Sequence, residues 1–116
     1  EDKRLISSVI MNRLKKNMKL QIDASTIFSI TKGKYKFDRE LLLNDLNIKD
    51  RYNTYYIYGL PPTPICFVSR KTIEIVLENY NSDYLFYFYN EKLKKHIFSQ
   101  SFSEHKSKLN EYRRNL

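Results

Sequence analysis

Apolar positions at the start of the chain recur with the period of an α-helix. In residues 2–16 they fall three or four positions apart, at Leu5, Ile6, Val9, Ile10 and Leu14. Glu1 and Asp2 stand at the start of this segment, where a helix dipole favours negative charge. Lys15 and Lys16 stand at its end, where the dipole favours positive charge. The pattern predicts an amphipathic helix over residues 2–16.

Capping residues predict two further helices in the first half of the chain. Asp23 or Ser25 is placed to begin a helix that runs through Ile30 and ends at Gly33. Asp38 is the expected N-cap of a helix over residues 38–46.

Two more helices are predicted in the second half. Ser69 is the expected cap of a helix over residues 70–79, whose inner face would hold Ile73, Val76 and Leu77. Ser101 and Glu104 have the spacing of a capping box and predict a helix that runs to the basic C-terminus.

Runs of aromatic and β-branched residues predict strands. Residues 54–58 form one run, which Gly59 and the following prolines end because proline donates no ladder hydrogen bond. Residues 84–89 form a second run, and residues 93–98 return after a turn, as in a β-hairpin. The sequence therefore predicts an α+β fold: a small mixed domain with a short sheet that includes a C-terminal β-hairpin, packed by amphipathic helices.

Length and charge indicate how many domains the chain forms and what kind of partner it binds. Its 116 residues predict one domain over residues 1–116. No apolar run approaches the roughly 20 residues of a membrane-spanning helix, and the opening Glu1–Arg4 is no signal peptide. The opening lacks Met, so we expect a fragment of a larger protein. The formal charge of +8 indicates an anionic partner, such as nucleic acid, anionic lipid or bacterial cell wall, unless it only keeps the domain soluble.

The chain lacks the motifs of several enzyme classes. His96 and His105 have no Cys or carboxylate at ligand spacing, so no metal site is expected. Cys66 lies among apolar residues and is expected to be buried rather than nucleophilic. Only two glycines are present, which rules out a Gly-rich phosphate loop. We therefore expect no metal and no cofactor.

Two polar stretches are candidates for a binding site. The first places Asn12 before Leu20–Ser25 at the exit of the first helix. The second, residues 52–65, combines four tyrosines with all three prolines, and such a stiff backbone suits the wall of a groove. Each also has a purely structural interpretation: helix capping for the first, and a core strand followed by a stiff loop for the second.

Several motifs follow one another in a fixed order. The first 25 residues combine an acidic pair, an apolar helix, Asn12-Arg13-Leu14 and a Leu-Gln-x-Asp sequence. The later motifs are Tyr52–Tyr55, Gly59–Ile65, Asp83–Phe86, His96–Ser99 and Glu104-His105. In this order and spacing the chain resembles, over almost its whole length, the catalytic domain of the MltG (YceG-like) family. These are membrane-anchored endolytic transglycosylases of bacterial peptidoglycan.

The resemblance implies a lyase mechanism with a single acid. A protonated glutamic acid would donate to the glycosidic oxygen between N-acetylmuramic acid (MurNAc) and N-acetylglucosamine (GlcNAc). The muramyl C6 hydroxyl would then attack C1 and leave a 1,6-anhydro end. The family's glutamate lies on a helix upstream of the acidic pair. The catalytic residue is therefore expected before Glu1, none is expected within the chain, and the chain alone would be inactive.

The resemblance also implies a sugar-binding groove and its surroundings. The expected substrate-binding residues are Asn12, Gln21, Asp23, Ser25, Tyr52, Asn53, Thr54, Tyr55, Pro61, Pro62 and His96. His96 is equally well explained as a hairpin residue with local hydrogen bonds. The expected partners are peptidoglycan glycan strands and cell-wall synthesis proteins, with no nucleic acid. The expected location is the extracytoplasmic side of the bacterial cytoplasmic membrane, held by an anchor outside this segment.

The chain departs from the family pattern at three places. The family usually has Pro at Ala24, Gly at Thr63, and Asn-Pro-Gly at Phe67–Ser69. These departures place the ligand contacts of the loop after Pro64 in question.

Two other functions compete with an enzyme. The first is a non-catalytic module that binds glycan strands or a partner of cell-wall synthesis. The second is RNA binding by tyrosines and lysines. The second is disfavoured because the aromatic residues cluster in apolar runs away from the lysines at 15–19 and 92–95.

Overall fold

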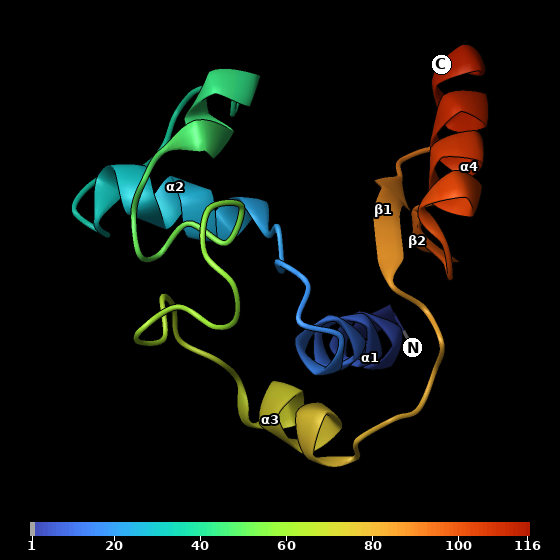
Figure 1. The fold of residues 1–116 in the computed structure, drawn as a ribbon, viewed down its shortest axis with the longest axis horizontal. Helices are drawn as coiled ribbons and strands as arrows, with labels where there is room; N and C mark the ends of the chain where they lie inside the picture. The colour runs from blue at the N-terminus through green and yellow to red at the C-terminus, as the bar shows by residue number, and fades with distance from the viewer. Residues whose placement is uncertain (1) are drawn as a thin grey trace. The chain divides into compact units, whose positions relative to one another are not determined.

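The computed structural model describes residues 2–116, so Glu1 and its expected role at the start of the first helix lie outside the described residues. These residues contain helices and one two-stranded antiparallel sheet, joined by turns and irregular segments, which confirms the α+β class (Figure 1). The chain divides into two compact units. The first unit comprises the residues up to Asn12 together with Val68–Leu116, and the second comprises Arg13–Phe67. The single domain over residues 1–116 stays a prediction.

Helix α1 (Asp2–Lys15) is confirmed, and hydrogen bonds fasten it to the rest of the first unit. The Arg4 guanidinium donates to Glu78 at 2.6 and 3.1 Å, and the hydroxyl of Ser8 lies 2.6 Å from that of Ser82. Val9, the residue after Ser8, is only 1% exposed. The helix is therefore held by polar contacts on the N-terminal side of its most buried apolar residue.

The predicted hairpin is also confirmed. Strand β1 (Phe86–Asn90) pairs antiparallel with strand β2 (Lys95–Ser99), so that Phe86 lies opposite Ser99. Phe98 on β2 is buried and contributes to the core of the first unit.

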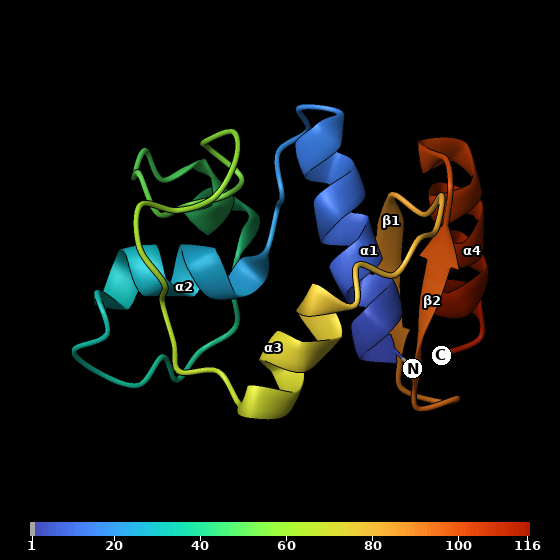
Figure 2. The same cartoon turned by 90° about the horizontal axis from the view of Figure 1, so that it is seen from below.

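Helix α4 (Phe102–Arg114) begins at the predicted cap. The Ser101 hydroxyl accepts from the Glu104 backbone N–H at 3.1 Å, and the Glu104 carboxylate accepts from the Gln100 N–H at 2.9 Å. The helix packs along the hairpin (Figure 2). There the His105 ring stacks on Phe86, with 5.2 Å between ring centroids.

Helix α2 (Asp23–Thr31) in the second unit matches the predicted span within one residue. The predicted cap at Asp23 or Ser25 is wrong, because both residues lie inside the helix and its N-cap is Ile22, which makes no side-chain cap bond. The helix ends at Lys32, whose left-handed backbone (φ 54°) lets its N–H bond the Phe28 carbonyl. Gly33 follows with φ 73°, a conformation for which glycine is best suited.

The α-helix predicted over residues 38–46 is wrong. The structure has a short 3₁₀ helix, η1 (Leu43–Asn47), and Asp38 caps nothing. The Asp45 carboxylate accepts from the Leu42 N–H at 2.7 Å and from the Arg39 guanidinium at 2.8 and 3.1 Å. The Asp45 carboxylate thus fixes the start of the 3₁₀ helix at Leu42, three residues before it. The sequence prediction considered Asp38 as the cap and did not consider Asp45.

The strand predicted over residues 54–58 is wrong as well. These residues form turns, and the N–H groups of Tyr56 and Ile57 both bond the Asn53 carbonyl at 2.9 Å. Tertiary contacts around Asn53 override the β-propensity of the tyrosines.

Helix α3 (Arg70–Leu77) has its predicted cap, because the Ser69 hydroxyl accepts from the Thr72 N–H at 3.1 Å. Its predicted inner face is wrong, since Ile73 and Val76 are each 48% exposed and Leu77 is 76% exposed.

Two further observations concern the remaining predictions. Cys66 is exposed rather than buried, and its neighbours Phe67 and Val68 are exposed as well. None of the helices formed by residues 2–116 has the length and apolar character needed to cross a bilayer.

Candidate functional site

The two segments predicted to form a groove meet within the second unit. The Gln21 N–H donates to the Thr54 carbonyl at 3.2 Å, and the Ile22 N–H donates to the Thr54 hydroxyl oxygen at 2.8 Å. The Ser25 hydroxyl completes the connection at 2.7 Å from the Thr54 hydroxyl. Residues separated by about thirty positions in sequence therefore form one structural element.

Asn53 is the centre of this element. Its side-chain carbonyl accepts from the Thr26 hydroxyl at 2.7 Å and from the Tyr55 N–H at 3.1 Å. Its amide group donates to the carbonyls of Leu46 and Ile48 at 3.0 and 2.9 Å. The side chain makes four hydrogen bonds and is 0% exposed, so its position is fixed by the interior of the unit.

Three of the predicted substrate-binding residues thus lie in an inner layer. Ser25, Asn53 and Thr54 are at most 2% exposed, and their polar groups bond one another or nearby backbone. Their contact with a sugar stays a prediction. In the structure they hold the two segments together. Sequence reasoning missed their buried partner Thr26, which is 0% exposed, because a threonine inside a short helix carries no distinctive signal.

Three other predicted residues form an outer layer above them. The Tyr55 hydroxyl donates to the Asp23 carboxylate at 2.7 Å in a bond that is exposed, between an exposed aspartate and a half-buried tyrosine. Gln21 is also exposed, and its backbone is left-handed with φ 52°. A phenol, a carboxylate and an amide are therefore presented together, and such groups both donate to and accept from sugar hydroxyls.

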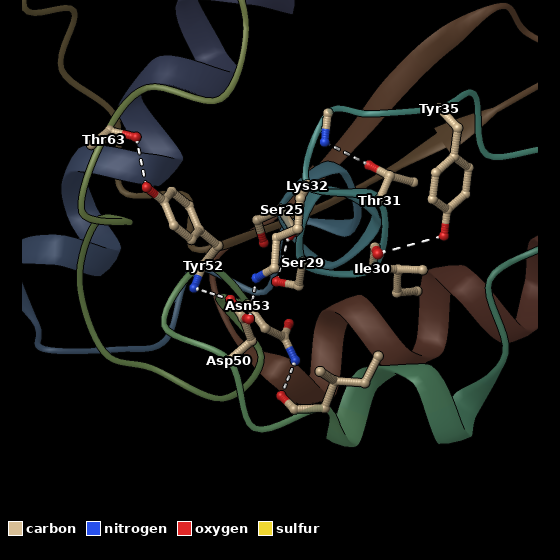
Figure 3. Close-up of polar contacts among 12 residues, drawn as sticks. Ser25, Ser29, Ile30, Thr31, Lys32, Tyr35, Asp50, Tyr52, Asn53 and Thr63 are labelled. Carbon is tan, nitrogen blue, oxygen red and sulfur yellow. Dashed lines mark hydrogen bonds and ion pairs between the residues drawn. The ribbon is translucent and has the colours of Figure 1, made fainter.

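Tyr52 connects this element to the proline segment. Its ring packs on Phe28 at 4.9 Å between centroids, with the Lys32 ammonium 5.7 Å from the centroid. Its hydroxyl lies 2.8 Å from that of Thr63, between Pro62 and Pro64 (Figure 3). Thr63 stands where the family usually has Gly. Glycine has no hydroxyl, so the threonine adds a hydrogen bond that the usual residue could not make. Of the other predicted prolines, Pro61 is half-buried and Pro62 is exposed.

An ion pair lies below the Tyr52 ring. The Lys32 ammonium bonds the Asp50 carboxylate, which also accepts from the Tyr52 N–H at 2.8 Å (Figure 3). Burial raises the pKa of Asp50, but the bonds from Lys32 and from the Tyr52 backbone outweigh it, so the pKa lies below its usual value. Asp50 is therefore a charged anchor for the Tyr52 turn.

Asn12 and His96 belong to the first unit and are held there. The Asn12 amide donates to the carbonyls of Ser82 and Tyr84 at 2.7 and 2.9 Å. The Asp2 carboxylate accepts from the His96 N–H at 3.1 Å and lies 2.9 Å from Nδ1 of the His96 ring. Both residues thus have the local partners expected of structural side chains.

The Asp2–His96 contact has an electrostatic consequence. The hydrogen bond with the His96 side chain, helped by the His96 backbone, lowers the pKa of Asp2 below its usual value. Sequence reasoning missed this partner because the two residues are 94 positions apart.

Each glutamate within residues 2–116 is exposed. The pKa of Glu78 is lowered by Arg4 and that of Glu104 by the Gln100 N–H, whereas a protonated acid at neutral pH needs a raised pKa. Within the same residues, no group of three His, Cys, Asp or Glu is arranged to hold a metal ion.

Comparison with known proteins places this geometry in context. The model of the YceG-like family matches residues 1–111. A protein of Bacillus subtilis (strain 168) named endolytic murein transglycosylase is 38% identical over 111 residues, which cover 96% of this chain and 29% of that protein. A protein of the same name from Streptococcus pneumoniae serotype 2 (strain D39) is 34% identical over 88 residues, covering 75% of this chain and 16% of that protein.

A solved structure agrees with these relatives. The crystal structure of a putative YceG-like protein from Listeria monocytogenes is 36% identical and superposes with a TM-score of 0.80. The match covers 92% of this chain and 34% of that one. The chain thus spans less than a third of the curated relatives that it matches. By its sequence and its fold, this chain belongs to the YceG-like family.

Proposed function

We propose that this chain is part of an endolytic murein transglycosylase, which cleaves the MurNAc–GlcNAc bond of peptidoglycan and leaves a 1,6-anhydro-MurNAc end. The observation that carries the proposal is the 38% identity to the Bacillus subtilis protein of that name, extending over 96% of the chain. The joined segments of the second unit add a polar surface suited to a glycan strand.

The reaction needs one acid and no water. A glutamic acid on the segment before Glu1 donates its proton to the glycosidic oxygen, and the bond from that oxygen to C1 of MurNAc breaks. The C6 hydroxyl of the same MurNAc forms the new bond to C1, and its proton passes to the glutamate. Because no water attacks, the second carboxylate of an ordinary glycosidase is not required. No metal or cofactor takes part.

This chain supplies binding and rigidity. Gln21, Asp23 and Tyr55 bond the hydroxyl and acetamido groups of the sugar strand. The Tyr52–Thr63 bond holds the proline segment, so the wall of the site loses little entropy when a strand binds. The inner layer of Ser25, Asn53 and Thr54 keeps both segments in place.

The cellular location and the partners of the enzyme follow from its substrate. Peptidoglycan lies outside the cytoplasmic membrane, so we place this domain on the extracytoplasmic side, held by an anchor outside this segment. The formal charge of +8 favours the anionic cell wall, and other proteins of cell-wall synthesis are further partners.

The test compares two proteins on purified glycan strands. One is this chain, and the other also contains the residues encoded before Glu1. We expect the longer protein to release fragments with anhydro-muramyl ends, detected by mass spectrometry, and this chain to release none. Turnover by this chain alone would refute the placement of the acid.

The same assay separates the proposal from a binding module. If the longer protein binds glycan strands but cuts none, the protein is a glycan-binding module and the enzymatic proposal fails. Binding to a structured RNA at matched salt, with none to glycan strands, would instead support nucleic-acid binding.

A further inference from the structure

A lysine and an exposed tyrosine of the second unit form a contact that the proposed mechanism does not use. The Lys19 ammonium lies over the Tyr58 ring, 5.2 Å from its centroid, as in a cation–π interaction. Tyr58 is 63% exposed, so most of its ring is open to a ligand. Lys19 is half-buried, although lysine side chains are mostly exposed. The two residues, which we call the Lys19–Tyr58 pair, thus present an aromatic surface with a positive charge held against it.

The positive charge of Lys19 is not neutralised by a carboxylate. Among residues 2–116 the Lys19 ammonium has no acidic partner. Lys32 makes a similar contact with the ring of Tyr52, at 5.7 Å from its centroid, but there Asp50 pairs with the ammonium. A carboxylate of a ligand is the group that would complete the Lys19–Tyr58 pair in the same way.

Buried contacts hold the backbone on both sides of the pair. The Arg13 guanidinium donates to the Lys19 carbonyl at 3.1 Å, and Arg13 is only 8% exposed. On the other side, the N–H of Ile57, the residue before Tyr58, donates to the carbonyl of the buried Asn53 at 2.9 Å. Because this backbone is already fixed, a ligand that binds the pair orders little of the chain.

The pair lies beside the polar surface described above. Lys19 precedes Gln21 by two positions, and two residues span at most about 7 Å. Tyr58 follows Tyr55 by three positions, and the bond from the Gln21 N–H to the Thr54 carbonyl ties the two segments together. A strand bound by the outer layer of Gln21, Asp23 and Tyr55 would therefore have the pair within reach.

The chemistry of the pair matches one kind of sugar. The C–H face of a pyranose ring is apolar and packs on an aromatic ring. MurNAc also carries a lactyl group, which ends in a carboxylate or in a stem peptide that has carboxylates of its own. GlcNAc has no such group, so a charged subsite distinguishes the two sugars.

We infer that the Lys19–Tyr58 pair is a subsite for a carboxylated amino sugar, in which Tyr58 packs on the ring and Lys19 bonds the carboxylate. The identity of the sugar as part of peptidoglycan rests on the proposed function. A nucleic acid fits the pair less well, because the exposed Asp23 carboxylate of the outer layer would repel its phosphates.

The experiment measures the affinity of the longer protein for three soluble glycans of equal length by calorimetry. Denuded strands carry the lactyl carboxylate, strands with stem peptides carry only peptide carboxylates, and chito-oligosaccharides carry none. Lys19→Gln should weaken binding to a carboxylated glycan about fivefold and leave the affinity for chito-oligosaccharides unchanged. The carboxylated glycan that responds identifies the source of the carboxylate. An equal change for all three glycans, or no change for any, would overturn the inference.

A second variant tests the aromatic surface. Tyr58→Ala should weaken binding to all three glycans about tenfold, because each presents the same kind of sugar ring. Tyr35 is 60% exposed in the same unit and Lys36 is exposed, so Tyr35→Ala and Lys36→Gln are the matched controls and should leave the affinities unchanged. A loss in Tyr58→Ala no larger than that in Tyr35→Ala would overturn the inference. So would a loss of binding to a structured RNA, but not to glycans, in Lys19→Gln and Tyr58→Ala.

These affinities do not depend on turnover. If Lys19→Gln separates the carboxylated glycans from chito-oligosaccharides while the parent releases no anhydro-muramyl ends, the subsite stands and the proposed function fails. If the parent releases such ends and Lys19→Gln binds all three glycans as the parent does, the function stands and the subsite fails.

Discussion

The hydroxyl of Ser25 lies 2.7 Å from the hydroxyl of Thr54 in the interior of the second unit. Ser25 lies within α2, and Thr54 lies in the turn that follows Asn53. The contact therefore joins two segments of the chain through residues that are 29 positions apart. The two polar stretches that the sequence indicated as candidate binding sites thus meet in space. Their buried residues hold the two stretches together, and the neighbouring exposed residues offer polar groups to a ligand.

Asn53 should be the most sensitive position of this network. Asn53→Ala removes the partner of the buried Thr26 hydroxyl, the amide bond to the Leu46 carbonyl and one of the two bonds to the Ile48 carbonyl, which keeps the Asp50 N–H. We therefore expect a loss of about 3 kcal/mol of unfolding free energy. Urea denaturation followed by circular dichroism measures it. The exposed Asn44 is the matched control, and Asn44→Ala should change stability by less than about 0.5 kcal/mol. Similar losses in both variants would contradict a structural role for Asn53.

The exposed Asp23–Tyr55 bond should matter for binding rather than for folding. Asp23→Ala or Tyr55→Phe removes one hydrogen-bonding group, so we expect the longer protein to bind glycan strands about 5–10-fold more weakly. Asp38→Ala and Tyr35→Phe change the same residue types at exposed positions elsewhere and should leave affinity unchanged. Sedimentation with insoluble glycan measures the bound fraction. An affinity loss no larger than that of the controls would remove these two residues from the proposed site.

Asp45 should titrate at low pH. The Arg39 side chain, together with the Leu42 N–H, lowers the pKa of Asp45 to about 2, against about 3.9 in an unfolded chain. Its stabilising effect is therefore complete above pH ~4 and is lost as the pH falls toward 2. Carbon-13 NMR of the Asp45 carboxyl should give a midpoint near 2, and Arg39→Gln should raise it toward 3.9. A parent midpoint already near 3.9 would show that the Arg39 contact does not persist in solution.

Asp2 should protect a backbone amide of the hairpin. The Asp2 carboxylate accepts from the His96 N–H, so Asp2→Ala should accelerate exchange of that amide by about tenfold, the equivalent of one hydrogen bond. Lys3→Ala alters an exposed residue of the same helical turn and should leave the rate unchanged. Exchange followed residue by residue in NMR spectra makes the comparison. Equal rates in the parent and in Asp2→Ala would mean that another group protects His96.

Cys66 should react in the native state. Because the side chain is exposed, a thiol reagent such as Ellman's reagent should titrate one thiol per chain at a rate close to that in denaturant. The unreactive thiol expected from the apolar neighbours Ile65 and Phe67 would support the sequence prediction instead.

The elements that sequence predicted well are those whose cause is local. The hairpin over β1 and β2 and the cap at Ser101 depend on residues within a few positions of one another, so pattern and spacing suffice. The strand expected at 54–58 failed where a longer-range contact decided the backbone, because the Asn53 and Thr54 side chains bond Thr26 and Ser25 of α2. The helix expected at Asp38 failed for a local reason, because the Asp45 carboxylate bonds the Leu42 N–H and Arg39 and so starts the helix at Leu42.

The sequence by itself determined the α+β class, the caps at Ser69 and Ser101, and through its ordered motifs the YceG-like family. Only the tertiary structure decided which polar residues are interior and which are presented, and which partners Asp2 and Thr26 have. The physical reason is the range of the interactions. Periodicity and capping act within a turn or two of backbone. The inner network joins residues 27 to 32 positions apart, and its partners are chosen by packing and by the cost of leaving a buried polar group unpaired.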